Sequence, residues 1–191
     1  MHYSLSDMIL DLVQNSIEAK AEKITLDLIR SGNILTVRLG DNGCGMTEGE
    51  LKKASDPFYT DGIKHCHRKI GLGIPFLIQT VEQTDGRFEI HSEKNMGTSL
   101  DIEFNLGNVD TPPEGSWPGL FMQAFCFEGD YELIINRKLI SEEKGEPGYT
   151  LSRRELKDVL GDFSDAGAMI LLRDYLQSQE DELLSELKEI H

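Results

Sequence analysis

The fold is decided by a nine-residue stretch near the start of the chain, Asp11-Leu-Val-Gln-Asn15-Ser-Ile-Glu-Ala19. Apolar residues recur through it at helical spacing, which predicts a helix with one buried face. Asp7, Asp11 and Asn15 are four residues apart and form a polar stripe beside that face. An amide oxygen suits Mg²⁺ and a carboxylate can orient or deprotonate a water, so the stripe is a candidate site. The alternative is that these polar residues only face solvent.

Two glycine motifs follow this helix. Asp41-Asn-Gly43-Cys-Gly45 comes directly after a predicted strand. Its carboxylate can accept a hydrogen bond from an amine such as that of adenine, and its glycines let a flat ring approach. Gly71-Leu-Gly73 precedes a predicted helix, whose exposed backbone amides favour an anion such as phosphate. Taken singly, each motif is equally typical of an ordinary turn.

A basic cluster, Lys64-His-Cys-His-Arg68-Lys69, lies between the two motifs. Its position before the glycines predicts a lid that neutralises a polyphosphate. A solvated basic loop is the alternative. A metal site at His65, Cys66 and His67 is disfavoured because adjacent residues rarely ligate one ion.

The sequence predicts short elements on both sides of a turn-rich stretch over residues 107–115. Before it we expect a helix from Ser4 or Ser6 to about Ala21, a hairpin of 23–30 and 33–39, a helix capped by Thr47 and Glu50, a helix over 74–81, and a hairpin of 87–92 and 98–104. After it we expect a hairpin of 120–127 and 131–136, a helix capped by Ser152, and a helix from about Gly167 to the end, solvated on most faces from Ser178 onward.

This stretch predicts a boundary between two domains, residues 1–107 and 108–191. The first part has 16 acidic and 11 basic side chains, and the second has 18 and 8, giving net charges of −5 and −10. We expect the acidic second part to serve for dimerisation or for docking a partner with a basic face.

Composition excludes several classes of protein. The 191 residues carry a net charge of −15, which disfavours binding to a nucleic-acid backbone. No apolar run approaches the roughly 20 residues that span a bilayer, and the start has no basic signal region. Three cysteines without a CxxC pair argue against a disulfide framework, so we expect a cytoplasmic protein without membrane contact.

In their order, these motifs resemble the GHKL superfamily of gyrase-type ATPases, heat-shock chaperones, histidine kinases and MutL-type repair proteins. The stretch from Asp11 to Ala19 is similar to the family's N box, and Asp41–Gly45 to its first glycine box. Gly71–Gly73 resembles the second glycine box and Gly97-Thr98-Ser-Leu100 the last. Asp56-Pro-Phe-Tyr59 resembles the lid motif of histidine kinases. The resemblance covers about residues 5–107.

The resemblance implies an α+β fold, a two-layer α/β sandwich with ATP under a flexible lid and a smaller α+β extension at the C-terminus. By position, Asn15 ligates Mg²⁺, Asp41 accepts from the adenine amine, and Thr98 lies beside it. The remaining implied ATP-binding residues are Gly43, Gly45, Lys64, Gly71 and Gly73. Arg68 is an alternative to Lys64 for reaching the phosphates.

The resemblance leaves the fate of ATP open. Family members that hydrolyse ATP usually have Glu where this chain has Asp11, whose carboxylate is one methylene shorter. Only about ten residues precede the N box, so we expect no phosphoacceptor histidine domain. A slow Mg²⁺-dependent ATPase with Asp11 as the catalytic residue is the first hypothesis. The alternatives are a non-hydrolysing ATP-gated regulator and a kinase of the anti-sigma type that acts on a partner protein.

Overall fold

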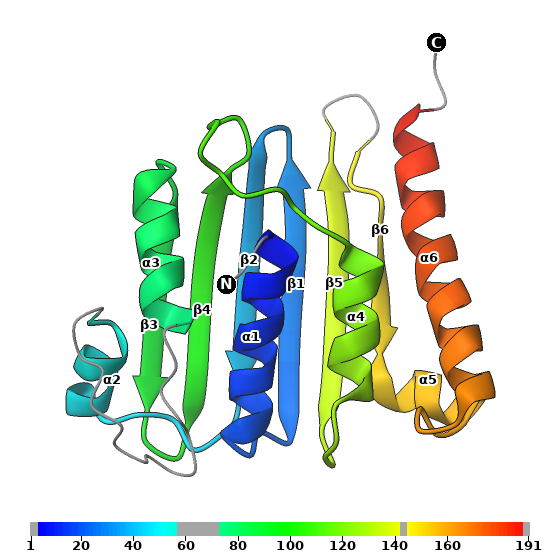
Figure 1. Ribbon diagram of the computed structural model, residues 1–191, viewed down its shortest axis with the longest axis horizontal. Helices are drawn as coiled ribbons and strands as arrows, with labels where there is room; N and C mark the ends of the chain where they lie inside the picture. Colours follow the sequence, from blue (N-terminus) through cyan, green and yellow to red (C-terminus); the bar gives the residue numbers. More distant parts are fainter. Residues whose placement is uncertain (1–3, 57–72, 142–144, 189–191) are drawn as a thin grey trace.

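The computed structural model describes residues 4–56, 73–141 and 145–188, which form a six-stranded sheet and its helices (Figure 1). The strand order is β3-β4-β2-β1-β5-β6, and only the β1–β5 pair is parallel among these strands. The strands are β1 Lys23–Ser31, β2 Ile34–Asp41, β3 Arg87–Glu93, β4 Gly97–Asn105, β5 Glu132–Ile140 and β6 Gly148–Ser152. The helices are α1 Leu5–Glu18, α2 Glu48–Ala54, α3 Gly73–Gln83, α4 Trp117–Cys126, α5 Arg153–Leu160 and α6 Ala166–Lys188.

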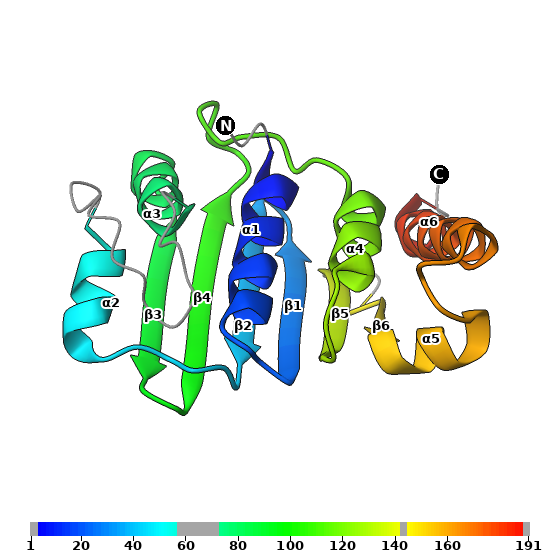
Figure 2. The same cartoon turned by 60° about the horizontal axis from the view of Figure 1, so that its bottom comes forward.

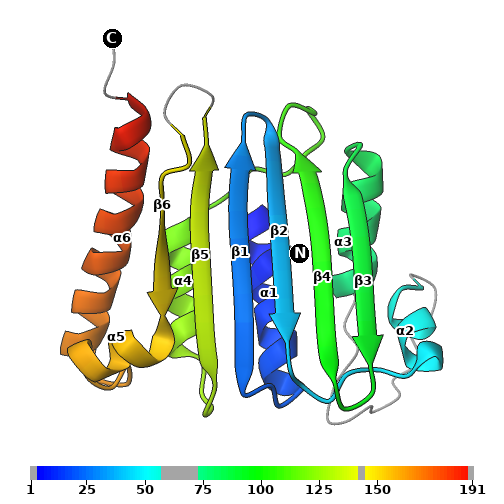
Figure 3. The same ribbon diagram turned by 180° about the vertical axis from the view of Figure 1, so that it is seen from behind.

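Among the described residues, only one face of the sheet is covered by helices. Helices α1, α3 and α4 cover one face and form a second layer (Figure 2). From behind, the described part of the chain shows bare strands on the other face, with α6 beside the β6 edge and α2 beyond β3 (Figure 3). This arrangement confirms the predicted two-layer α/β sandwich.

Alternation along the strands explains the one-sided cover. In β1, Ile24, Leu26 and Leu28 are fully buried, whereas Thr25 and Asp27 between them are half-buried. Successive side chains point to opposite faces, so the apolar set meets the helices and the polar set meets water. The buried residues form one apolar core with the inner stripe of α1.

The helices and hairpins predicted for the first half of the chain are confirmed, except for the end of the first helix. The side-chain oxygen of Ser4 accepts a hydrogen bond from the backbone N–H of Asp7, so Ser4 caps α1. Thr47 and Glu50 form a capping box at α2, and the N–H of Thr47 holds the pKa of the Glu50 carboxyl below its usual value. Helix α1 ends at Glu18, earlier than predicted, and the backbone turns at Lys20 with φ of +61°.

The predicted hairpin of 120–127 and 131–136 is wrong. Residues 117–126 form helix α4, which Ser116 caps and Pro118 opens. Its buried residues recur at helical spacing, which the prediction of a strand overlooked. They are Trp117, Leu120, Phe121, Ala124 and Phe125.

Strand β5 pairs with β1 instead, in parallel, from Lys23 opposite Glu132 to Ser31 opposite Ile140. Parallel neighbours need a crossover connection, and α4 lies on the path from β4 to β5. The sheet and the apolar core therefore continue across the predicted boundary at residue 107. The division into domains 1–107 and 108–191 stays a prediction.

A buried arginine binds the backbone at the C-terminal end of α4. Ser152 caps α5 as predicted, and Arg153 follows it with 8% of its surface exposed. The guanidinium donates to the backbone oxygens of Phe125 and Tyr131, each at 2.9 Å, and lies 4.0 Å from the Tyr131 ring centre. Burial raises the pKa of Tyr131 to about 12, so its hydroxyl stays protonated and donates to the Ala124 carbonyl.

The final helix carries a buried ion pair that the sequence analysis missed. Glu180 was expected on a solvated stretch, yet only 5% of it is exposed. Its carboxylate accepts from Arg137 at 3.2 Å and from the Tyr149 hydroxyl at 2.6 Å. Burial, and then the hydrogen bond to Glu180, raise the pKa of Tyr149.

Across 4–56, 73–141 and 145–188, no helix has both the length and the apolar character needed to cross a bilayer.

We expect Glu180→Ala to lower the free energy of unfolding by about 3 kcal/mol, because it leaves the Arg137 charge buried without its partner. Chemical denaturation followed by circular dichroism measures this change. Glu182→Ala, on the exposed side of α6, is the matched control and should shift the free energy by less than about 0.5 kcal/mol. Equal effects of the two substitutions would contradict the dependence of the buried Arg137 charge on Glu180.

Candidate functional site

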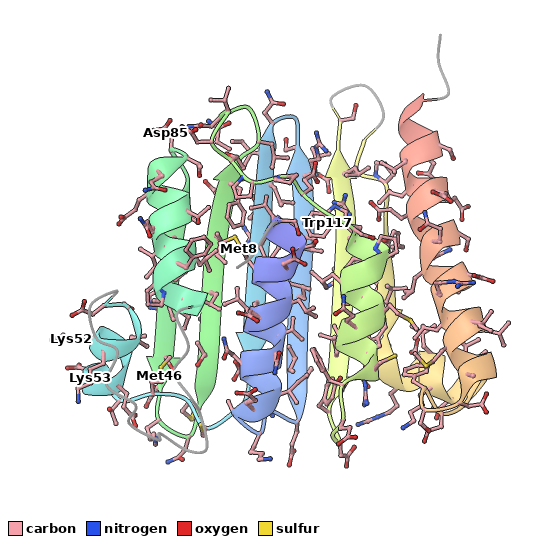
Figure 4. All side chains as sticks on the ribbon, viewed as in Figure 1. Met8, Met46, Lys52, Lys53, Asp85 and Trp117 are labelled. Carbon is pink, nitrogen blue, oxygen red and sulfur yellow. The ribbon has the colours of Figure 1, made fainter. Side chains whose placement is uncertain are left out.

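Three segments of the chain meet where β2 ends: the end of α1, the loop after β2 and the turn before β4. The N–H of Cys44 in the loop donates to the Ala19 carbonyl that follows α1, at 2.9 Å. The N–H of Asn95, before β4, donates to the Cys44 carbonyl at 2.8 Å. Figure 4 shows Met46 of the same loop at this end of the sheet, near β3 and β4. The predicted motifs on these segments are thus close in space.

Three polar residues form a row across neighbouring strands. Asp41 of β2 pairs with Thr98 of β4, which pairs in turn with Ser92 of β3. Leu39 and Leu100, two positions along from Asp41 and Thr98, are buried against the helices. Because side chains alternate, the row faces the helix layer as well. A recess of about 620 Å³ touches all three residues at the end of the sheet. Its lining also includes Thr25, His91 and Ser99 of the uncovered face and no residue of the described helices α1 and α3.

The Asp41 carboxylate is held by two donors. Its Oδ2 accepts a hydrogen bond of 2.8 Å from the Ser16 hydroxyl on α1, and its Oδ1 accepts one of 2.8 Å from the Gly43 N–H. A carboxylate has about four acceptor sites, so two such bonds orient it and leave further lone pairs. Sequence reasoning missed Ser16, although it follows Asn15 directly and lies on the buried side of α1.

The two other members of the row are joined by their hydroxyls. The Ser92 Oγ lies 2.9 Å from the Thr98 Oγ1 and 3.1 Å from the Gly97 carbonyl. It also accepts a hydrogen bond of 2.9 Å from the Met46 N–H. Ser92 therefore ties the loop after β2 to the start of β4. It was not singled out in the sequence, since a serine in a strand carries no signal of its own.

The glycines of the first motif make the loop pack closely. A Cβ at Gly43 would lie 2.8 Å from the Ala19 carbonyl oxygen. Gly45 has φ of +54°, and a Cβ there would lie 1.9 Å from the Glu93 carbonyl oxygen. A side chain at either position would push the loop off α1 or β3. That these glycines also border a ligand stays a prediction.

The other end of the site lies between α1 and α3. Asp11 and Asn15 are one helical turn apart and half-buried. A Cβ at Gly73 would lie 3.3 Å from the Asp11 Oδ2, so the first residue of α3 stands beside this carboxylate. A helix start is electropositive, which suits an anion here.

Several predicted site residues lie outside the described residues. These are Lys64 and Gly71, together with the alternatives Arg68, His65, Cys66 and His67. Within the described ranges, no group of three or more His, Cys, Asp or Glu side chains is placed to hold a metal ion. A Mg²⁺ ion needs no such group, because it keeps several waters and takes one or two protein ligands with substrate phosphates.

Comparison with known proteins shows relatives among ATPases and kinases. Residues 3–108 match the family model described as histidine kinase-, DNA gyrase B- and HSP90-like ATPase. The chain is 27% identical over 104 residues to sporulation kinase C of Bacillus subtilis, covering 53% of this chain and 23% of that protein. It is 26% identical over 119 residues to the sensor histidine kinase RcsC of Escherichia coli, covering 61% of this chain and 12% of that protein. The chain thus spans less than a quarter of the curated relatives it matches.

The fold has solved counterparts. The Aquifex aeolicus MutL ATPase domain, described as complexed with ADP, superposes with a TM-score of 0.51 at 14% identity, covering 85% of this chain and 70% of that one. The N-terminal domain of a DNA repair protein superposes with a TM-score of 0.55 at 16% identity, covering 87% and 58%. Since the family model spans more than half of the chain, from α1 to the end of β4, the chain belongs to the family of histidine kinase-, DNA gyrase B- and HSP90-like ATPases.

Proposed function

We propose that the chain binds ATP with Mg²⁺ at this site. The observation that carries the proposal is the Asp41 carboxylate, which Ser16 and Gly43 hold on the helix side of the sheet with lone pairs to spare. Such an acceptor suits the exocyclic amine of adenine. The MutL ATPase domain, whose fold this chain shares, is described as an ADP complex, which supports a nucleotide ligand here.

The phosphates belong at the other end of the site. The start of α3 at Gly73 would receive them, and the Asn15 amide oxygen would ligate Mg²⁺. The ion would neutralise phosphate charge when bound. Asp11, beside Gly73, is the candidate for orienting or deprotonating the attacking water. The remaining proposed ATP-binding residues are Gly43, Gly45, Lys64, Gly71 and Thr98.

We further propose slow hydrolysis, with the nucleotide state closing a lid that contains the Lys64–Lys69 cluster and regulating a partner protein. Two other fates of ATP are the alternatives: sensing without turnover, and phosphotransfer to a partner. The relatives described as sporulation kinase and sensor histidine kinase favour the phosphotransfer alternative. The acidic part, 108–191, is the proposed contact for a partner or for a second copy of the chain.

Asp41→Asn tests the binding proposal. The amide presents its N–H₂ group where the carboxylate accepts, so we expect the Kd for ATP to rise at least about tenfold. Isothermal titration calorimetry in Mg²⁺ buffer measures it. Asp101→Asn makes the same change on the uncovered face of β4 and is the matched control. An Asp41→Asn protein that binds like this control would refute ATP binding through Asp41.

Asp11→Asn tests the hydrolysis proposal. If the Asp11 carboxylate activates water, phosphate release should fall about a hundredfold while the Kd for ATP changes less than about threefold. Asn15→Ala provides the blank, and Glu82→Gln, at the far end of α3, is the control for loss of one carboxylate. Turnover above the blank that Asp11→Asn leaves unchanged would remove Asp11 as the catalytic residue. Absence of turnover with ATP bound would favour the sensing or phosphotransfer alternatives.

A further inference from the structure

The hydroxyl of Ser92 has three hydrogen-bonding partners, and their chemistry determines where its proton goes. They are the Met46 N–H at 2.9 Å, the Gly97 carbonyl oxygen at 3.1 Å and the Thr98 Oγ1 at 2.9 Å. The N–H can only donate, the carbonyl can only accept, and the second hydroxyl can do either. Ser92 itself has one proton and two lone pairs.

Only one assignment satisfies all three contacts. Ser92 gives its proton to the Gly97 carbonyl, since that oxygen cannot donate. One lone pair of Ser92 receives the Met46 N–H, and the other is left for the proton of Thr98. The Thr98 hydroxyl then donates inward to Ser92 and has only lone pairs to offer elsewhere. The reverse direction, from Ser92 to Thr98, would sacrifice the bond to Gly97.

We propose that Ser92 is a positioning residue that makes Thr98 a hydrogen-bond acceptor, so that the site selects a purine with a 6-amino group over one with a 6-oxo group. This inference rests on the proposed binding of ATP. Asp41, the cross-strand partner of Thr98, is also an acceptor, and Ser16 and Gly43 keep it oriented. Two neighbouring acceptors match the two protons of an amine, whereas a 6-oxo group places an acceptor against both.

Substitution of Ser92 should therefore reduce the preference for a 6-amino over a 6-oxo purine more than it reduces the affinity for ATP. In Ser92→Ala, the Thr98 hydroxyl loses its inner acceptor and is free to turn its proton outward, where it can donate to a 6-oxo group. One neutral hydrogen bond corresponds to about a fivefold change in affinity. A residue that only supported the fold would change the affinities for both purines equally.

The experiment measures the Kd of the full chain for ATP and for inosine triphosphate, its 6-oxo analogue, with Mg²⁺. We expect the wild-type protein to prefer ATP. In Ser92→Ala, the Kd for inosine triphosphate divided by the Kd for ATP should fall about fivefold. Ser92→Thr keeps the hydroxyl and should hold the ratio within about twofold. Thr36→Val removes a hydroxyl from the uncovered face of β2, away from the recess, and should change neither Kd.

Each outcome has a definite meaning. A ratio unchanged in Ser92→Ala, equal losses of affinity for both nucleotides, or a wild-type protein without preference would overturn the inference and leave ATP binding intact. A wild-type protein that binds neither nucleotide would refute the proposed function, and the inference with it. A Thr98→Val variant that keeps the wild-type ratio would also overturn the inference, because that substitution removes the proposed acceptor.

Discussion

The docking of helix α1 against the sheet is the constraint on which the site depends. The inner stripe of α1 is almost entirely apolar, and Leu12 and Val13 are 2% and 0% exposed. Ser16 is a polar member of the same stripe, and its hydroxyl bonds to the Asp41 carboxylate at the end of β2. Asp11 and Asn15 belong to the same rigid helix. A shift of α1 would therefore move both ends of the proposed ATP site at once.

The loop after β2 completes this arrangement from the other side. It is held to α1 through the Ala19 carbonyl and to the β3–β4 hairpin through Ser92 and Asn95. The tight approach at Gly43 and Gly45 lets these bonds form. The first and last glycine motifs thus act as one structural unit, and the carboxylate and the hydroxyls face the helix layer together.

The C-terminal part of the chain builds on the same sheet. Strand β5 pairs with β1 in parallel, and α4 covers β5. Helix α6 is joined to β5 by the buried ion pair of Arg137 and Glu180. The guanidinium of Arg137 also lies 5.5 Å from the Trp117 ring centre, which links α4 to this pair. The family model ends at residue 108, whereas the fold likeness to the MutL ATPase domain covers 85% of the chain. The likeness in fold therefore extends well beyond the motifs.

The sequence by itself determined the features that depend on near neighbours: the capping box at Thr47, both hairpins of the first half and the order of the motifs. Local periods and turn chemistry specify these features. The sequence left the cap of the first helix open between Ser4 and Ser6, and the structure gives Ser4. Only the tertiary structure decided that β5 joins β1 and that Glu180 is buried, whereas the helix over 117–126 follows a local helical period that the predicted strand missed. The tertiary structure alone placed the Ser16 hydroxyl against the Asp41 carboxylate and the Ser92 hydroxyl against that of Thr98. Each of these depends on partners 6 to 109 residues away in the chain, and no local pattern encodes such contacts.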